Sequence, residues 1–288
     1  MTTPDFASNR ENFCYRHPDR QSFVLCQRCM RTICAECQTQ APVGVICPEC
    51  MKEQRKAQTP AQRKANRRWG GSIAANGQPI VTYALLAVTT VFGVLQVMFG
   101  KTFDNLTLFW ALYLLPDFSG VFEPWRLFTS MFVHGGLWHF LLNMLALWMI
   151  GRILEPMIGR WRYLALYLIG GVGGSVAVAV LSPLDAVVGA SGAIFALMGA
   201  LLVIGRQLGG DVRGILVILG LNLAVGIFIA GISWQAHVGG VIVGALIGLI
   251  YSRTRERRQR TVQILLLVAL TAVLVIALAI VPPMLLPH

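Results

Sequence analysis

Long apolar segments, separated by short polar ones, make up most of the chain after residue 79. A helix needs about 20 apolar residues, or roughly 17–25, to cross a bilayer. The pattern predicts an all-α polytopic membrane protein whose spans are Ile80–Phe99, Leu137–Leu154, Tyr163–Leu181, Val187–Gly205, Gly214–Ser233, Gln235–Tyr251 and Ile264–Met284.

The composition supports this class. Hydrophobic residues make up 56% of the chain and charged residues only 13%, whereas soluble domains are about 25% charged. The net charge of +11 could indicate a nucleic-acid partner. However, the basic residues lie at the ends of apolar segments, as membrane topology requires, so we predict no nucleic-acid partner.

The same basic residues predict an orientation. With the N-terminus in the cytoplasm, only Lys101 and Arg126 face outward, and the other 22 of the 24 Lys and Arg residues are cytoplasmic. We expect an integral protein of a bacterial plasma membrane. The outer loop Gly100–Gly136 is rich in aromatic residues, so it is expected to lie partly helical in the interface.

The N-terminal region contains all seven cysteines, between Cys14 and Cys50. It lacks an apolar signal segment, so a secreted disulfide framework is disfavoured and metal binding in a reducing compartment is favoured. The candidate ligands form four pairs with two intervening residues: Cys14 and His17, Cys26 and Cys29, Cys34 and Cys37, Cys47 and Cys50. This spacing predicts two structural, non-catalytic Zn²⁺ sites in a small domain whose folding depends on metal.

The cysteine segment resembles B-box and other cross-brace zinc fingers. That resemblance implies interleaved pairing, in which Cys14, His17, Cys34 and Cys37 hold one ion and Cys26, Cys29, Cys47 and Cys50 hold the other. Sequential pairing is the alternative. The module is either purely structural or a docking module for a protein partner.

Three predicted spans carry polar residues near their outer ends. Ser191 lies within Gly189–Gly192, His237 lies in the sixth span, and His139 and Asn143 share one face of the second. In the predicted topology His139, Ser191 and His237 lie two to five residues inside the membrane, roughly 3–8 Å deep. They supply a nucleophile, a base and an oxyanion donor for acyl transfer.

Other interpretations of these residues exist. Small residues around Ser191 are typical of helix packing, and an intramembrane histidine can bind metal or relay protons. The stripe of Gly240, Gly244 and Gly248 also indicates helix packing. We expect it to bring the sixth span against the fourth, with His237 near Ser191.

The combined motifs resemble those of the rhomboid intramembrane serine proteases. The resemblance covers about residues 80–251 and rests on Gly189-Ala190-Ser191-Gly192, Ala236-His237-Val238-Gly239-Gly240, His134-x4-His139-x3-Asn143 and Trp125-Arg126. It implies Ser191 as nucleophile and His237 as general base. It also implies an oxyanion hole made by the Asn143 and His139 side chains and the Ser191 backbone N–H, and a structural role for Glu155.

The chain departs from the family pattern at Phe195, where a tyrosine is frequent; ring stacking on His237 is retained but the hydroxyl is absent. No carboxylate clearly completes a triad. Asp185 could approach, but Pro183 and its position indicate a loop residue. A dyad suffices if packing orients His237.

These features define the expected organisation and function. We expect a zinc-finger domain over residues 1–51, a basic linker over 52–79, a six-helix rhomboid core over 80–251, and a basic loop and seventh C-terminal span over 252–288. The expected function is cleavage of transmembrane protein substrates within the lipid bilayer, near the outer membrane face, by a Ser–His dyad. The alternative is a non-catalytic protein that binds client helices in the manner of a chaperone and docks through its zinc domain. A transporter is less favoured because the spans show no obvious inverted repeat.

Overall fold

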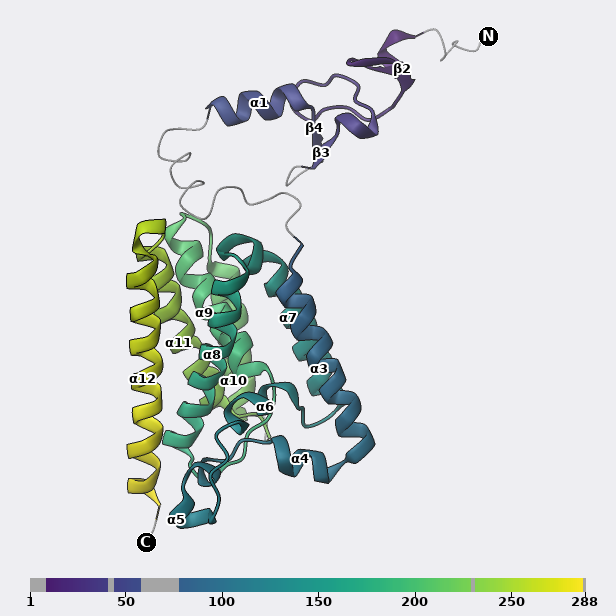
Figure 1. Ribbon diagram of the computed structural model, residues 1–288. Helices are drawn as coiled ribbons and strands as arrows, with labels where there is room; N and C mark the ends of the chain where they lie inside the picture. The colour runs from purple at the N-terminus through teal and green to yellow at the C-terminus, as the bar shows by residue number, and fades with distance from the viewer. Residues whose placement is uncertain (1–8, 41–43, 58–77, 229–230, 287–288) are drawn as a thin grey trace. The chain divides into compact units, whose positions relative to one another are not determined.

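The computed structural model describes residues 9–40, 44–57, 78–228 and 231–286. The chain forms two compact units, Met1–Arg67 and Arg68–His288 (Figure 1). The second unit is built from helices, and the first contains short strands and clustered cysteines, so the predicted fold class is confirmed.

The first unit is small and has little regular structure. Its strands β1 (Phe13–Cys14) and β2 (His17–Gln21) pair antiparallel, as do β3 (Thr39–Gln40) and β4 (Val45–Ile46). The short 3-10 helices η1 (Arg10–Asn12) and η2 (Ala35–Cys37) and the helix α1 (Pro48–Ala57) complete it. Apart from the cysteines, only Ile33 and Ile46 among the described residues of this unit are buried apolar side chains. Hydrophobic burial is therefore small here.

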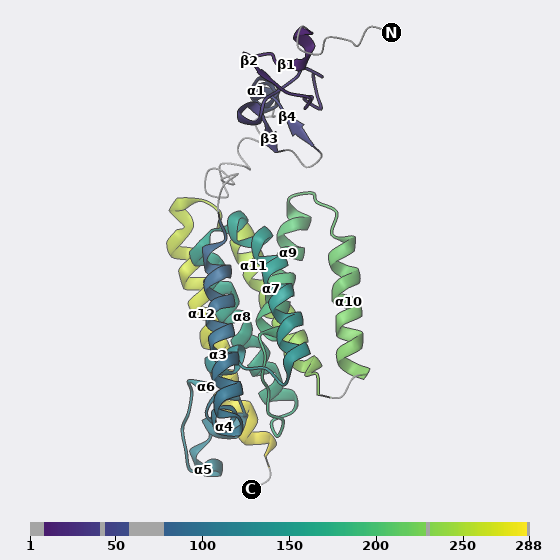
Figure 2. The ribbon, with the colours of Figure 1, turned by 90° about the vertical axis from the view of Figure 1, so that its right-hand side faces the viewer.

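The second unit is a bundle of long helices (Figures 1 and 2). Within the part of the chain that the structure describes, five are long and apolar enough to cross a membrane: α3 (Ile80–Phe99), α7 (Leu137–Ile158), α8 (Arg160–Leu181), α11 (Trp234–Arg253) and α12 (Arg260–Leu285). Two shorter apolar helices, α9 (Ser191–Gln207) and α10 (Arg213–Phe228), complete the seven predicted segments. The expected end of the fifth segment includes Ile229 and Ala230, which lie outside the described residues.

The start of the fourth span was predicted wrongly. We expected a helix from Val187, but α9 begins at Ser191. The backbone of Val187 instead pairs with that of Phe109 in an antiparallel bridge, through N···O distances of 3.1 and 2.8 Å. Gly189 then adopts a φ of 117°, which L side chains rarely adopt. Ser191 therefore lies at the first position of a helix and not inside one.

Helices α8, α9 and α11 form the core of the bundle, and α3 and α12 lie on opposite sides of it in Figure 1. The glycine stripe on α11 packs directly against the backbone of α9, as expected. A Cβ added to Gly240 would collide with the carbonyl oxygen of Gly192, and one added to Gly244 would collide with Ala196. The two backbones are in contact because neither glycine carries a side chain.

Buried polar contacts hold the peripheral helices α3 and α12 against the rest of the bundle. Glu155 of α7 accepts hydrogen bonds from the N–H groups of Val81 and Thr82 at 2.9 and 2.7 Å, so its carboxylate caps the first turn of α3. On the other side, Gln263 of α12 accepts a hydrogen bond from Arg162 of α8 at 2.8 Å. Glu155 thus has the contacts that a structural role requires.

The expected outer loop is partly helical. It contains α4 (Lys101–Thr107), η3 (Ala111–Leu114), α5 (Pro116–Ser119), α6 (Arg126–Thr129) and η4 (Ser130–Phe132). Arg126 is buried, forms an ion pair with Glu123 at 2.5 Å and lies over the ring of Tyr113. This loop packs against the bundle and supplies the contacts that hold the segment before Ser191.

Candidate active site and metal-binding clusters

The backbone leading to Ser191 is fixed by three contacts. Val187 forms the bridge with Phe109, the N–H of Gly189 donates to the carbonyl of Ser130 at 2.9 Å, and the N–H of Ala190 donates to His134 Nε2 at 3.4 Å. Ala190 already has right-handed helical backbone angles, with φ of −70° and ψ of −7°, and α9 begins at the next residue. These contacts set the position of Ser191.

The first turn of α9 surrounds Ser191 with backbone N–H groups. The first N–H groups of a helix have no carbonyl partner within it, and the helix dipole adds positive potential at the same end. No side chain caps this turn. An oxyanion formed beside Ser191 would therefore meet the Ser191 N–H and a favourable potential.

His237 lies in the first turn of α11 and is buried. Its ring stacks on that of Phe195 with centroids 4.0 Å apart and an interplanar angle of 7°. Phe195 follows Ser191 by one turn of α9, so both lie on the same helix face. The His237 ring therefore packs on the face of α9 that carries Ser191.

Packing orients His237 without a carboxylate among the described residues. Its Nδ1 is buried with no hydrogen-bond partner there, and it lies close to Gly226 of α10. Asp185 is exposed in the turn after α8. Within the same described residues no hydrogen bond joins Ser191 to His237; catalytic hydrogen bonds are frequently long before substrate binds.

His139 lies in the first turn of α7, with its ring against Gly189: a Cβ at Gly189 would be 2.9 Å from His139 Nε2. The Gly135 N–H donates to His139 Nδ1 at 3.3 Å. A ring nitrogen that accepts carries no proton, so neutral His139 holds its proton on Nε2, the nitrogen that faces Gly189.

Asn143 follows His139 by one turn and is buried. Its Nδ2 donates to the His139 carbonyl at 2.7 Å, which leaves a second N–H on the same nitrogen. The three expected spans thus place His139, Ser191 and His237 each in the first turn of a helix. Their catalytic roles stay a prediction.

Two polar residues near this site were missed by the sequence analysis. Gln96 of α3 and Asp104 of α4 are hydrogen-bonded to each other at 2.7 Å, and Gln96 also contacts the backbone of His134. A glutamine inside an apolar span was the available signal, because polar side chains there require partners. The sequence could not show that its partner would be the loop before His139.

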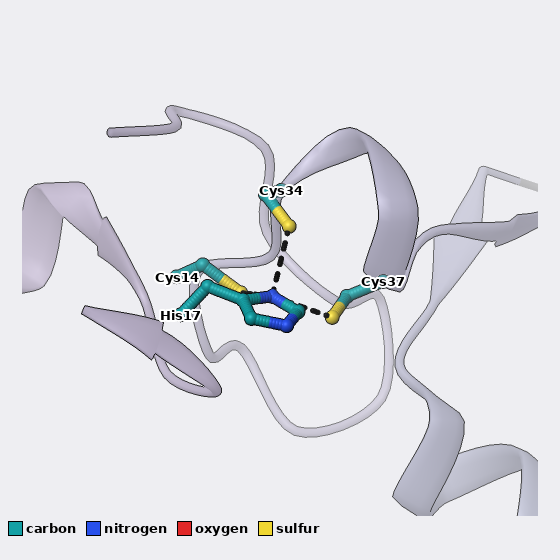
Figure 3. Close-up of side chains that lie close together, drawn as sticks. All are labelled: Cys14, His17, Cys34 and Cys37. Carbon is teal, nitrogen blue, oxygen red and sulfur yellow. Dashed lines mark hydrogen bonds between the residues drawn. The ribbon is translucent and has the colours of Figure 1, made fainter. Parts of the chain in front are cut away.

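The expected metal ligands lie in two tight clusters in the first unit. One contains Cys14, His17, Cys34 and Cys37 (Figure 3), and the other contains Cys26, Cys29, Cys47 and Cys50. Within each cluster the ligand atoms lie within 4.8 Å of one another, and all seven cysteines are free. The structure therefore groups the eight residues in the interleaved order and not sequentially.

The clusters fit a tetrahedral zinc ion. With bonds of about 2.3 Å to sulfur and 2.0–2.1 Å to nitrogen, tetrahedral ligands are separated by about 3.8 Å for two sulfurs and about 3.5 Å for sulfur and nitrogen. Cys29 Sγ and Cys47 Sγ are 3.8 Å apart, and His17 Nδ1 lies 3.3 Å from Cys34 Sγ and 3.4 Å from Cys37 Sγ. The donor atoms already have the spacing that the ion imposes.

The surroundings favour the thiolate form of a ligand. Burial raises the pKa of the Cys26 thiol, but backbone N–H groups of Cys29, Arg28 and Cys47 outweigh it and lower that pKa to about 6. Arg31 also donates to Cys29 Sγ at 3.3 Å. Because thiolates are the metal-binding form, these donors prepare Cys26 and Cys29 for a cation. In the same cluster, burial and the neighbouring thiols raise the pKa of Cys50 to about 12.

The sequence of the chain is similar to those of known proteins. Residues 121–254 match the Rhomboid domain. The chain is 34% identical over 233 residues to "Rhomboid protease GluP" of Bacillus subtilis, which covers 76% of this chain and 43% of that protein. It is 39% identical over 136 residues to "RHOMBOID-like protein 1" of Arabidopsis thaliana, or 45% of this chain and 35% of that protein.

A shorter relative is covered more fully. The "Putative rhomboid protease YdcA" of Bacillus subtilis is 35% identical over 145 residues, which are 47% of this chain and 71% of that protein. The chain spans less than half the length of GluP and about a third of RHOMBOID-like protein 1. The Rhomboid-domain match includes Ser191, His237, Ser130 and His134. Together with the relatives it shows that the chain belongs to the rhomboid family.

Proposed function

We propose that the protein is an intramembrane serine endopeptidase in which Ser191 and His237 form a catalytic dyad. The observation that carries the proposal is the arrangement around the start of α9. Ser191 opens the helix, His237 stacks on Phe195 of the same helix face, and the His139 ring lies against Gly189. The names of the curated relatives, which include the word protease, support the same reaction class.

The reaction proceeds by acyl transfer. Ser191 Oγ attacks the scissile carbonyl carbon while His237 takes the hydroxyl proton. The oxyanion that forms accepts hydrogen bonds from the Ser191 N–H, from His139 Nε2–H and from the free N–H of Asn143. Collapse of the intermediate breaks the C–N bond, and His237 returns its proton to the leaving amine. Water then attacks the acyl-enzyme with His237 again as base, which releases the second product and restores the serine.

The substrates are proposed to be transmembrane proteins cut near the outer face of the bilayer. The predicted topology, with a cytoplasmic N-terminus, places the first turns of α7, α9 and α11 on the outer side. An intact substrate helix hides its carbonyls in backbone hydrogen bonds, so it must unwind locally before Ser191 can reach one. Water enters from the outer side for the second half of the reaction.

The first unit is proposed to bind two Zn²⁺ ions that hold its fold and take no part in catalysis. Besides the cysteines, Ile33 and Ile46 are the two buried apolar side chains among its described residues, and they supply little hydrophobic stabilisation. Metal binding is therefore proposed to supply much of the folding free energy. In the predicted topology this unit is cytoplasmic, where it serves as a docking module for a protein partner.

Activity-based labelling tests the proposed chemistry. A fluorophosphonate probe should label the full-length protein in detergent, and Ser191→Ala should abolish both labelling and cleavage of a model transmembrane substrate. His237→Ala should do the same while leaving the melting temperature nearly unchanged. Cleavage at the wild-type rate by purified Ser191→Ala protein would rule out the dyad, and a protein that binds client helices without cutting them would then be the better description.

A further inference from the structure

The side-chain amide of Gln96 makes three hydrogen bonds near the site, and the proposed mechanism does not use it. Its Nε2 donates to Asp104 Oδ1 at 2.7 Å and to the His134 carbonyl at 2.8 Å, and its Oε1 accepts the His134 N–H at 3.1 Å. A backbone N–H can only donate, so the oxygen of the amide must face it. The orientation of Gln96 is therefore fixed, and its donors and its acceptor all have partners.

The peptide held by Gln96 is the one that contacts His139. The His134 carbonyl and the Gly135 N–H belong to one planar peptide unit and point in opposite directions. Gln96 binds the carbonyl side, and the N–H side donates to His139 Nδ1 at 3.3 Å. The hydrogen bond from Gln96 thus fixes the orientation of the His134–Gly135 peptide plane, and this orientation directs the Gly135 N–H toward the His139 ring.

We propose that Gln96 is a positioning residue that sets the tautomer of His139 through the His134–Gly135 peptide. The proposal rests on the role assigned to His139 in the proposed function. With Nδ1 occupied by the Gly135 N–H, the ring proton resides on Nε2 and can be donated to the oxyanion. If the peptide turns, Nδ1 loses its donor, the other tautomer becomes populated, and Nε2 then presents a lone pair that repels the oxyanion.

Asp104 supports this arrangement from the adjacent helix. Its carboxylate holds Gln96 Nε2 at 2.7 Å, which leaves the other N–H of that nitrogen directed at the His134 carbonyl. The first span and the helix after it are thereby linked to His139 through the His134–Gly135 peptide. Gln96 acts on His139 through the His134–Gly135 peptide. Its effect therefore depends on which atoms of the Gln96 side chain donate and accept hydrogen bonds, and not only on the volume of that side chain.

The test uses two variants of the full-length protein that differ in that pattern. Gln96→Glu keeps the size of the side chain and an oxygen for the His134 N–H, but it removes the donor to the His134 carbonyl and places a carboxylate beside Asp104. Adding Asp104→Asn restores a hydrogen bond between the two side chains, because the new amide can donate to the glutamate. It does not restore the donor to His134. Thr90→Val, an isosteric change on the same helix, is the control.

Kinetics separate positioning from simple structural support. We expect kcat to fall on the order of 10–100-fold in both Gln96→Glu and the double variant, with KM nearly unchanged, as is typical when a supporting hydrogen bond is lost. In a His139→Ala background Gln96→Glu should cause no further loss of kcat, because the effect acts through that ring. Recovery of wild-type kcat in the double variant would overturn the proposal.

Nitrogen-15 NMR of histidine-labelled protein provides a readout that needs no activity. Wild type should show the His139 signals of the Nε2–H tautomer, identified by their loss in His139→Ala, and Gln96→Glu should shift them toward a mixture. An unchanged tautomer in Gln96→Glu would overturn the proposal even if kcat fell. Should the wild type cleave no substrate, the proposed function fails, and the tautomer measurement still decides the role of Gln96.

Discussion

Phe195 illustrates how one side chain can replace a polar contact in orienting a histidine ring, here that of the proposed base His237. The Nδ1 of His237 has no hydrogen-bond partner among the described residues, so the ring is oriented by stacking on Phe195 and by packing near Gly226. An aromatic pair of this kind contributes about 0.5–1.5 kcal/mol beyond the area that it buries. Packing against the face of the His237 ring, and not a hydrogen bond to Nδ1, therefore orients the proposed base.

This arrangement predicts different results for two substitutions of Phe195. Phe195→Leu should lower kcat/KM by up to about tenfold, because it removes a stacking interaction of about 1.4 kcal/mol or less. Phe195→Tyr keeps the ring and should retain activity close to that of wild type. Steady-state kinetics on a model substrate measures both. Equal losses in the two variants would show that the stacked ring does not orient His237.

At the level of elements, the direct backbone contact between α9 and α11 brings the two residues of the proposed dyad together. Ser191 and His237 are separated by 46 positions in the sequence and come from two helices. The glycine stripe on α11 allows these helices to approach more closely than any side chain would permit. The proposed site therefore depends on glycine at these positions of α11, because a side chain there would push α9 and α11 apart.

Gly244→Val tests this contact. The new side chain would collide with the backbone of Ala196, and moving backbone atoms apart typically costs about 1–3 kcal/mol. We expect a lower melting temperature in detergent and loss of substrate cleavage. Gly220→Ala in α10 is the matched control, because a Cβ there has no neighbour within 4 Å. A fully active, equally stable Gly244→Val protein would contradict the close packing of the two helices.

At the level of the whole molecule, the first unit and the helical bundle have different sources of stability. The bundle buries a large cluster of apolar side chains from α3, α7, α8, α9, α11 and α12. The described part of the first unit groups eight potential metal ligands and buries only two apolar residues besides its cysteines, so we propose that bound metal supplies much of its stability. Removing metal should therefore unfold the first unit and leave the bundle intact.

Metal analysis of two double variants tests both the ions and their pairing. Full-length protein should carry two Zn²⁺ per chain. In the interleaved arrangement, Cys14→Ser with Cys34→Ser damages one site and should leave one equivalent, whereas Cys14→Ser with Cys26→Ser damages both and should leave none. Sequential pairing predicts the reverse. Either the reverse pattern or a metal-free wild type would refute the proposed sites.

Removing the first unit should leave the chemistry intact. A truncated chain beginning at Trp69 retains all helices of the bundle, and we expect its kcat/KM for a generic model substrate to stay within a few-fold of full length, because none of the proposed catalytic residues is removed. Both proteins should be measured in the same liposomes. A folded but inactive truncated chain would show that the first unit supports the active conformation.

The sequence by itself determined where the apolar helices lie and which residues are candidate metal ligands. Apolar length predicted seven helical segments, and the α3 segment Ile80–Phe99 matches its helix at both ends, because burial in lipid demands a continuous apolar run whatever the neighbours are. The pairs formed by seven cysteines and His17 predicted the eight clustered residues, since a two-residue spacing places two potential ligands on one turn. Ser191, His237 and His139 were likewise visible as polar groups in predicted apolar spans, where ionisable side chains are rare.

Only the tertiary structure decided how these parts meet. The helix at Ser191 starts four residues later than its apolar pattern predicted, because the bridge to Phe109 and the backbone of Gly189 replace helical hydrogen bonds. The interleaved grouping of the metal-ligand candidates also joins residues far apart in the chain. The hydrogen bond from Gln96 to the His134 carbonyl does the same. Hydropathy is a property of local segments, whereas such hydrogen bonds and ligand sets form between distant ones, so no local pattern can specify them.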